Sequence, residues 1–332
     1  MTTLGITVGK FYPFHLGHDH LIRTARAQVD HLVVLVGAAP DQAIPGSVRA
    51  AWIRSLHPEV EVVEVVDDLP AAPEPWARRA LEVLGGRRPD VAFTSEDYGE
   101  PWARLMGARH CCVDLDRRTF PVSGTLLRQD LGAHWHLLTP PAKAWLTRRV
   151  CLVGVESSGK STLAEALARH YRTAWVPEYG RWYWEGRRHA PDSERWDREE
   201  FVRIARGQAA WEDDLAHRSH RVLLCDTDPL MTSVWRRRYL GDASPPDPEL
   251  ERLAAKRKYD LSLLTLPDFP YVQDGTRESE HVRIDMHRWL IEALEAQGRR
   301  YVEIGGSPEE RLASAVQEID PLLACAGLIE SR

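Results

Sequence analysis

The sequence contains no long hydrophobic run, which excludes a membrane-spanning helix of about 20 apolar residues. It also lacks a basic excess: Lys and Arg total 43 against 49 Asp and Glu, a formal net charge of -6. We do not expect such a chain to coat nucleic acid, because neutralising phosphates needs clustered cations. The N-terminal residues lack the basic and apolar regions of a signal peptide, so we expect a cytoplasmic location.

Cysteine is sparse. The five cysteines form an odd set without regular spacing, which predicts neither a disulfide framework nor a zinc motif. Cys151 and Cys225 stand in apolar runs, where cysteine acts as a small hydrophobic residue. The rest of the composition, with 43% hydrophobic and 28% charged residues, is typical of a globular protein. A length of 332 residues favours two domains over one.

Short β-branched apolar runs alternate with amphipathic stretches along the whole chain. The predicted strands are residues 4–8, 32–36, 60–66, 91–94, 150–153, 174–176, 222–225, 261–264 and 301–304. The predicted helices include residues 18–29, 47–56, 75–84, 160–171, 197–217, 229–239, 280–297 and 308–323. This alternation predicts parallel sheets that are covered on both faces. We therefore expect an α/β protein with two parallel-sheet nucleotide-binding domains, residues 1–146 and 147–332.

The strongest motif follows the predicted strand at residues 150–153. Gly154 begins a G-x-x-x-x-G-K-[ST] pattern that runs directly into a helical stretch. In such a loop the backbone N–H groups and the helix N-terminus face phosphate oxygens. A glycine turn before an ordinary helix is the alternative, which the strand–helix context disfavours. The expected ATP-binding residues here are Gly154, Glu156, Ser157, Ser158, Gly159, Lys160, Ser161 and Thr162.

Carboxylates follow two other strands of the second half. Asp226 ends the run at residues 222–225, where it can hold Mg²⁺ together with Ser161. Asp228 precedes Pro229 and is expected only to cap the next helix. Glu178 follows residues 174–176 and could accept a proton from an acceptor hydroxyl; a helix start with a surface salt bridge is an equal alternative.

Three further positions of the second half are weaker candidates. Tyr179 could stack on a substrate ring, and Arg181 could hold a phosphate. A polar stretch stands before a predicted helix and comprises residues 273–277, among them Arg277, together with Arg283. That stretch is either a lid with a phosphate-clamping arginine or a loop with a solvated charge.

A different anion site is predicted in the first half. After the first strand, His15 and His18 stand three residues apart at a helix start, so they can share one face. Two imidazoles beside helix N–H groups suit a polyphosphate without a metal; two unrelated histidines are the alternative. Near residue 123 a second short helix begins with an N-cap serine, and an ordinary capped helix is again the alternative. The expected ATP-binding residues are Gly9, Lys10, Phe11, His15, Gly17, His18, Ser123, Thr125 and Arg128.

These motifs carry a family resemblance. Residues 9–18 resemble the H-x-G-H signature of the nucleotidyltransferase superfamily, and residues 122–128 resemble its I-S-x-T-x-x-R element. A Rossmann-like nucleotidyltransferase followed by a P-loop kinase resembles, over nearly the whole chain, the NadR-type bifunctional proteins of bacterial NAD synthesis. Some members begin with a DNA-binding domain that represses transcription. Here the first strand starts by Leu4, so a DNA-binding role is not implied.

The resemblance implies two reactions. The first domain would transfer adenylyl from ATP to nicotinamide mononucleotide (NMN), and the second would phosphorylate nicotinamide riboside with Mg-ATP. The implied catalytic residues are His15, His18, Lys160, Glu178 and Asp226, with the kinase base undecided between the last two. Ser161 and Asp226 would serve the metal. Substrate contacts are expected from Trp102, Tyr179, Arg181 and Arg277, although Trp102 could equally be a packing residue.

Two rival functions remain open at this point. The same two modules could act on other nucleosides, or the chain could be a regulator that senses NAD and ATP with little turnover. Lys160, His15 and His18 argue against pure sensing, because a sensor need not keep catalytic groups. The expected partners are the small molecules ATP, NMN and nicotinamide riboside, with no nucleic acid and no membrane. The oligomeric state is left open.

Overall fold

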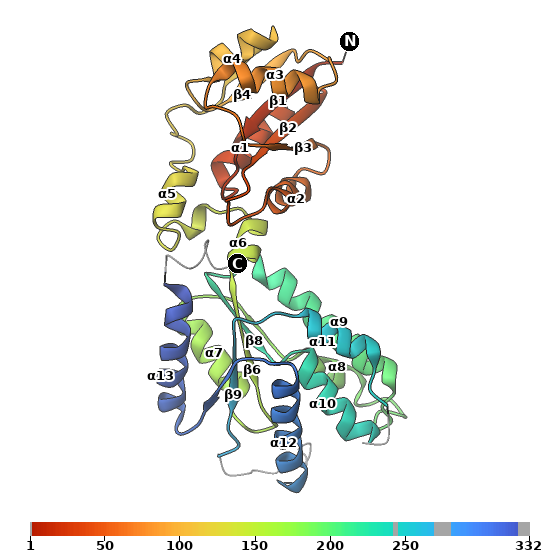
Figure 1. Cartoon of the computed structure of the whole chain (residues 1–332). Helices are drawn as coiled ribbons and strands as arrows, with labels where there is room; N and C mark the ends of the chain where they lie inside the picture. The colour runs from red at the N-terminus through yellow and green to blue at the C-terminus, as the bar shows by residue number, and fades with distance from the viewer. Residues whose placement is uncertain (1, 242–244, 269–279, 325–332) are drawn as a thin grey trace. The chain divides into compact units, whose positions relative to one another are not determined.

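A computed structural model describes residues 2–241, 245–268 and 280–324. The chain forms two compact units that divide after Ala142 (Figure 1). Helix α6 (Pro140–Leu146) contains this division near its start. In the part of the chain that the structure describes, no helix is long and apolar enough to cross a membrane.

The first unit is built on a five-stranded parallel sheet with the order β3-β2-β1-β4-β5. Its strands are β1 (Leu4–Gly9), β2 (His31–Ala38), β3 (Glu61–Val66), β4 (Val91–Thr94) and β5 (Arg109–Cys112). Its helices are α1 (Leu16–Arg26), α2 (Gly46–Leu56), α3 (Pro73–Val83), α4 (Gly99–Met106) and α5 (Gly124–Gln129), followed by a 3-10 turn at Trp135–Leu137. Leu4 and Ile6 of β1 point to the same face of the sheet, where they pack against α3 and α4.

The second unit has a parallel sheet with the order β10-β9-β6-β8-β7. Its strands are β6 (Arg148–Val153), β7 (Trp175–Val176), β8 (Val222–Asp226), β9 (Leu261–Thr265) and β10 (Tyr301–Ile304). Its helices are α7 (Lys160–Tyr171), α8 (Tyr179–Arg187), α9 (Arg198–Ala216), α10 (Pro229–Leu240), α11 (Pro248–Lys256), α12 (Glu280–Ala296) and α13 (Pro308–Ile319), with a final 3-10 turn at Asp320–Leu323.

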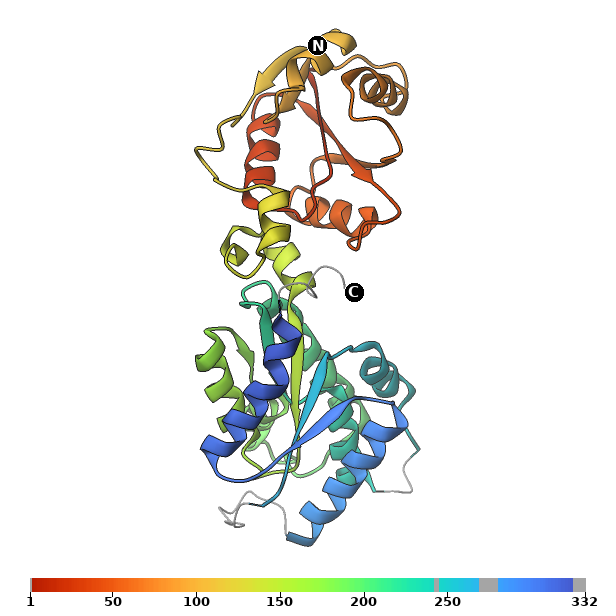
Figure 2. The ribbon, with the colours of Figure 1, turned by 60° about the vertical axis from the view of Figure 1, so that its left-hand side comes forward.

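Successive residues of β6 supply two separate cores. Val150 and Leu152 pack against α7 and α13, whereas Cys151 and Val153 pack against α10 and α12. Figures 1 and 2 show these helix pairs on opposite faces of the sheet. The two-sided burial explains why residues 150–153 of β6 are apolar without alternation, as the sequence predicts for a parallel sheet.

Each sheet reverses its strand order beside its first strand. β1 lies between β2 and β4, and β6 lies between β8 and β9. In open parallel sheets, such a switch point leaves a crevice at the carboxyl ends of the strands. The loops that follow β1 and β6 carry the two predicted phosphate motifs, so both motifs lie at these crevices.

The predicted α/β class with two parallel sheets is confirmed, and every predicted strand is present. Strand β5 was not predicted, because its residues Arg-His-Cys-Cys are partly exposed and lack an apolar run. The short helices α4 and α11 were not predicted, and the start of α8 was given only as the alternative for Glu178.

Candidate functional sites

His15 and His18 form the centre of the first site. His15 is the N-cap of α1, and its Nδ1 accepts a hydrogen bond from the backbone N–H of His18 at 3.3 Å. The two rings stack with centroids 3.5 Å apart. Because Nδ1 of His15 is an acceptor, the proton of its neutral ring lies on Nε2, which can donate to a ligand.

Both imidazoles are held neutral. Burial, together with Arg117, lowers the pKa of His15 to about 3. Burial, His15 and Arg117 lower the pKa of His18 well below its usual value. The Nδ1 atom of His18 is buried without a hydrogen-bond partner among the described residues. At neutral pH the pair therefore offers hydrogen bonds to a ligand, and no positive charge.

The second motif of the first unit meets the first. Ser123 caps α5 by accepting a hydrogen bond from Leu126 N at 3.1 Å, which confirms the predicted N-cap. Arg128 donates to the Tyr12 carbonyl oxygen at 2.7 Å and to Thr125 Oγ1 at 3.2 Å. A Cβ on Gly124 would lie 2.6 Å from the same carbonyl oxygen, so this close approach requires glycine. The two segments thus build one site.

Sequence reasoning missed Arg49, which fixes the loop after β1. This arginine of α2 is fully buried and donates to the carbonyl oxygens of Gly37 at 2.9 Å and of Lys10. Its guanidinium lies 5.5 Å from the ring centroid of Tyr12, and that of Arg128 lies 5.3 Å from it. Nothing in the sequence marks Arg49, because its partners are backbone carbonyls that only the fold brings together.

A cavity of about 500 Å³ opens above these residues. Trp102 lines it; the side chain is fully buried in the α3–α4 core, and its Nε1 has no hydrogen-bond partner among the described residues. At the rim, Lys10 Nζ forms an ion pair with Asp67 Oδ2 at 3.0 Å. The predicted site residues that line this cavity are Gly9, Lys10, Phe11, His15, Gly17, His18, Trp102, Ser123, Thr125 and Arg128.

The phosphate loop of the second unit has the conformation that its glycines predict. Gly154 has φ of 152°, and a Cβ there would lie 2.3 Å from Thr265 Oγ1. Ser158 Oγ bonds to Thr265 Oγ1 at 2.7 Å, which joins the loop to β9. Helix α7 begins at Lys160, whose Nζ donates to the Val155 carbonyl oxygen at 2.9 Å. The loop can thus present N–H groups and the lysine to an anion.

Two arginines support this loop from its outer side. Arg283 of α12 donates to the carbonyl oxygens of Glu156 at 3.0 Å and Ser157 at 3.2 Å, and it is 5% exposed. Arg311 of α13 donates to the Ser158 carbonyl oxygen at 2.8 Å. The reading of Arg283 as a solvated charge is wrong, because the guanidinium is needed to satisfy carbonyls that the loop turns outward. Residues 273–277, with Arg277, lie outside the described residues.

Asp226 and Glu178 face the phosphate loop from neighbouring strands. Ser161 Oγ donates to Asp226 Oδ2 at 2.5 Å, and Asp226 Oδ1 is buried without a hydrogen-bond partner among the described residues. Burial raises the pKa of Asp226, and Lys160 opposes that shift. Burial also raises the pKa of Glu178, against Lys160, and Asp226 adds to the increase. Asp228 caps α10 through Met231 N, as predicted.

An aromatic wall borders this second site. The cavity has a volume of about 640 Å³. Trp184 and Trp196 stack within it, with centroids 5.8 Å apart and planes at 26°. Tyr179 lies differently: its ring packs on Gly207, where a Cβ would be 2.4 Å from the ring, and on Trp211 with centroids 5.0 Å apart. Lining residues include Lys160, Ser161, Glu178, Arg181, Trp184, Trp196, Phe201, Gln208, Trp235 and Tyr239.

Both halves of the chain match known families. A cytidylyltransferase-like family matches residues 6–130, and an AAA domain family matches residues 149–311. The chain is 28% identical over 326 residues to the trifunctional NAD biosynthesis/regulator protein NadR of Escherichia coli (strain K12), covering 91% of this chain and 78% of that protein. The protein of the same name from Salmonella typhimurium (strain LT2) is 27% identical over 325 residues, with the same coverage.

Solved structures share the fold along the whole chain. A crystal structure of a NadR protein in complex with NR has a TM-score of 0.72 at 21% identity, covering 97% of this chain and 96% of that one. A second, of a NadR protein in complex with NAD and AMP-PNP, has a TM-score of 0.67 at 19% identity, covering 100% and 97%.

The fold and the two sites define the class of protein. A cytidylyltransferase-like nucleotide-binding domain is joined to a P-loop nucleotide-binding domain in one chain. The chain is homologous to the NadR proteins of Escherichia coli and Salmonella typhimurium, and the sequence similarity extends over both domains.

Proposed function

We propose that this protein is a bifunctional enzyme of NAD synthesis. Its second domain phosphorylates nicotinamide riboside with ATP to give NMN, and its first domain transfers adenylyl from ATP to NMN to give NAD and pyrophosphate. The observation that supports this most directly is that one chain holds two groups of residues suited to nucleotide phosphates: the Ser161–Asp226 pair, which suits the metal of a bound nucleotide, beside the phosphate loop, and the His15–His18 pair beside Arg128. The relatives named above align with this chain over both of its domains.

In the kinase domain, positioning and charge supply the catalysis. The loop N–H groups and Lys160 hold the β and γ phosphates of ATP. Glu178 orients the 5′-hydroxyl of the riboside and takes its proton as the new O–P bond forms and the bond from the γ phosphorus to the bridging oxygen breaks, releasing ADP. The raised pKa of Glu178, caused by burial and by Asp226, improves it as a base. Arg181 borders the same cavity and is suited to the transferred phosphate.

The residues around Lys160 fit a magnesium ion. Mg²⁺ prefers oxygen ligands and keeps most of its waters, so one or two protein groups suffice. Ser161 Oγ and Asp226 provide such oxygens, and the buried Asp226 Oδ1 lacks another partner among the described residues. Ser161 and Asp226 would hold the ion, which neutralises phosphate charge when bound. This assignment leaves Glu178 as the base.

The aromatic wall suits the charged ring of the riboside. Nicotinamide riboside carries a cationic pyridinium, and cations are attracted to the faces of indole rings. Trp184 and Trp196 line the cavity, and the carboxylates of Glu185 and Glu194 lie on it too. The guanidinium of Arg187 already lies 4.8 Å from the ring centroid of Trp196. We therefore assign ring recognition to Trp184, with Trp196 stacked behind it, because Tyr179 packs on Gly207.

In the first domain, a phosphate oxygen of NMN attacks the α phosphorus of ATP, and the bond to the leaving pyrophosphate breaks. No covalent enzyme intermediate is needed. His15 donates from Nε2, Arg128 supplies positive charge, and the N-terminal N–H groups of α1 face the phosphates. Lys10, Ser123 and Thr125 contribute further donors at the cavity, and Trp102 Nε1 is a donor for the nicotinamide end.

One incubation separates this proposal from its rivals. The full-length protein is mixed with Mg-ATP and nicotinamide riboside, and the products are followed by mass. NMN that appears first and is then converted to NAD is the expected result. Turnover of other nucleosides in preference to the riboside would support the same modules with another substrate. Binding of NAD and ATP without turnover would support a sensing regulator.

A further inference from the structure

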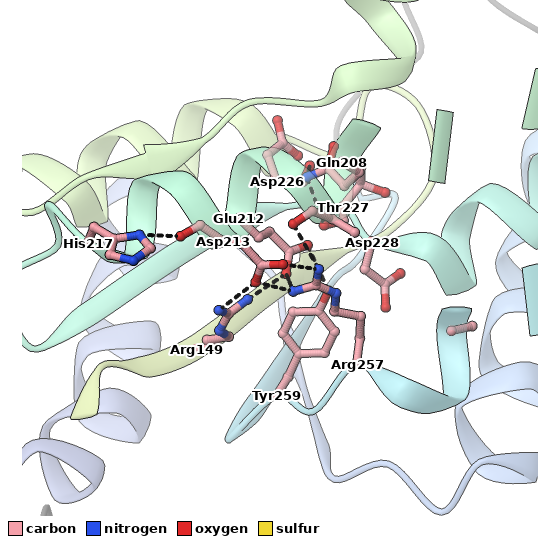
Figure 3. Close-up of polar contacts among 12 residues, drawn as sticks. Arg149, Gln208, Glu212, Asp213, His217, Asp226, Thr227, Asp228, Arg257 and Tyr259 are labelled. Carbon is pink, nitrogen blue, oxygen red and sulfur yellow. Dashed lines mark hydrogen bonds and ion pairs between the residues drawn. The ribbon is translucent and has the colours of Figure 1, made fainter. Parts of the chain in front are cut away.

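Gln208 lies where the turns that carry Glu178 and Asp226 meet. It is a residue of α9, is 1% exposed and borders the second cavity. Its Oε1 accepts a hydrogen bond from the backbone N–H of Tyr179 at 2.8 Å. Its Nε2 donates to the carbonyl oxygens of Asp226 and Thr227, each at 3.5 Å. Figure 3 shows the amide beside these two residues.

The first contact replaces a missing helix cap. Glu178 is the N-cap of α8, but its side chain makes no capping hydrogen bond. The first N–H groups of a helix have no partner within the helix and need one from outside. Gln208 supplies that partner to Tyr179 from another helix. The Glu178 carboxylate is therefore free of capping and remains available to Lys160, Arg181 and the substrate.

The second contact supports a strained turn. Thr227 has φ of 74°, a left-handed conformation that is unfavourable for a β-branched residue. Its N–H donates to the Leu152 carbonyl oxygen at 2.9 Å, which ties the turn to β6. The Gln208 amide faces the carbonyls on both sides of this residue. The turn that orients Asp226 toward Ser161 is thus held by β6 on one side and by Gln208 on the other.

We propose that Gln208 is a positioning residue of the kinase site, which sets the Glu178 turn and the Asp226 turn relative to each other through a single side-chain amide. The inference rests on the proposed riboside kinase activity. An amide is required because one contact needs an acceptor and the other needs a donor. A hydrocarbon provides neither, and an ionised carboxylate provides only the acceptor.

Two substitutions test this assignment in the full chain. Gln208→Leu removes both contacts at similar size. It should lower kcat for riboside phosphorylation by about 10-fold or more, as small misplacements of reacting groups do. KM for ATP should be unchanged, and so should NMN adenylylation in the first domain. The matched control is Glu212→Gln, one turn further along α9, where the side chain bonds to Arg149 and Tyr259 (Figure 3). The control should keep kcat.

Gln208→Glu adds a signature that loss of stability alone would not produce. A protonated carboxyl has one donor and one acceptor, as the amide does, whereas an ionised carboxylate repels the Asp226 and Thr227 carbonyls. The kcat of this variant relative to the native enzyme should therefore rise as the pH is lowered from about 8 to about 6. If the leucine variant does not fold, the glutamate variant alone tests the inference. A ratio of its kcat to the native kcat that stays constant across the pH range overturns the inference.

Hydrogen exchange separates the inference from the proposed function. Peptides spanning residues 176–184 should exchange faster in Gln208→Leu than in the native protein, with no such change in Glu212→Gln. If the native protein does not phosphorylate the riboside, the kinase assignment fails, and exchange alone then judges the role of Gln208. Unchanged exchange in a folded leucine variant, or native kcat in that variant, overturns the inference.

Discussion

Ser161 Oγ donates a hydrogen bond to Asp226 Oδ2 over 2.5 Å, which joins the first turn of α7 to the end of β8. Two oxygen ligands of the kind that Mg²⁺ prefers are thereby placed together at the phosphate loop. Glu178 reaches the same site from the start of α8 and has no hydrogen bond to Ser161 among the described residues. The two carboxylates thus have different structural surroundings, and substituting each should impair riboside phosphorylation in a different way.

Asp226→Asn should lower kcat for riboside phosphorylation and raise the Mg²⁺ concentration needed for half-maximal activity, because a neutral amide binds the ion less well. Added Mg²⁺ should restore part of the activity. Glu178→Gln keeps the shape of the side chain but loses its basicity, so its kcat should stay low at every Mg²⁺ concentration. Steady-state rates over a magnesium titration check both. Normal turnover by Glu178→Gln would transfer the base role to Asp226.

Lys160→Ala should reduce riboside phosphorylation by about 10²-fold or more, as loss of a transition-state charge contact does. NMN adenylylation should stay near the native rate, because Lys160 acts only in the second domain. Separate assays, with the riboside and with NMN as substrate, measure the two activities. Loss of both activities in a folded variant would contradict the assignment of two sites.

His18→Ala should have the opposite effect, with adenylyl transfer impaired and riboside phosphorylation retained. It removes a ring that stacks on His15 within the first cavity, and adenylyl transfer should slow by about 10²-fold or more. Riboside phosphorylation in the same preparation serves as the control and should persist. If adenylyl transfer proceeds at the native rate, His18 has only a structural role.

The neutral histidines also predict a pH profile. Because burial and Arg117 lower the pKa of His15 to about 3, protonation of this ring should not limit adenylyl transfer near neutral pH. The kcat/KM for adenylyl transfer, which reports ionisations of the free enzyme, should therefore show no acidic limb at the usual histidine pKa of about 6.5. A limb near that pH, lost in His15→Gln, would mean that a charged imidazole takes part.

Much of the fold follows from sequence because residues 150–153 of β6 are buried on both faces of the sheet and form a continuous apolar run. The phosphate loop and Ser123 could be predicted because their chemistry is local: a glycine conformation and an N-cap are set within a few residues. The edge strand β5 could not, since it is too polar to show a strand pattern.

Residues that act through tertiary contacts to the backbone were missed for a physical reason. Arg49, Gln208 and Arg311 bond to carbonyl or N–H groups that are distant in sequence, and any sequence has such groups everywhere. The role of Arg283 was left open for the same reason, because its partners are the backbone carbonyls of a loop that is distant in sequence. Only the fold shows which backbone groups these side chains must satisfy.

Glu212 predicts how stability depends on pH. This carboxyl is fully buried on α9, bonded to Tyr259 at 2.8 Å and paired with Arg149 at 3.2 Å, yet burial raises its pKa to about 7. Between the ordinary pKa and the raised one, the folded state keeps a proton that the unfolded state has lost. The contribution of Glu212 to the free energy of unfolding is therefore largest at low pH and declines as the pH rises toward 7. Glu212→Gln, which cannot titrate, should lack this decline.

The free energy of unfolding of the native protein, minus that of Glu212→Gln, should thus fall by roughly 2–3 kcal/mol between about pH 5 and pH 8. Both full-length proteins are unfolded in urea, and hydrogen exchange of peptides from α9 is the signal that reports unfolding of the second domain. The two unfolding curves give this difference. The two proteins are compared because their other titratable groups contribute equally to both free energies of unfolding, and these contributions cancel in the difference. A difference that does not vary with pH would mean that Arg149 and Arg257 keep Glu212 ionised in the folded state, and that the buried network in Figure 3 is a true ion pair at every pH tested.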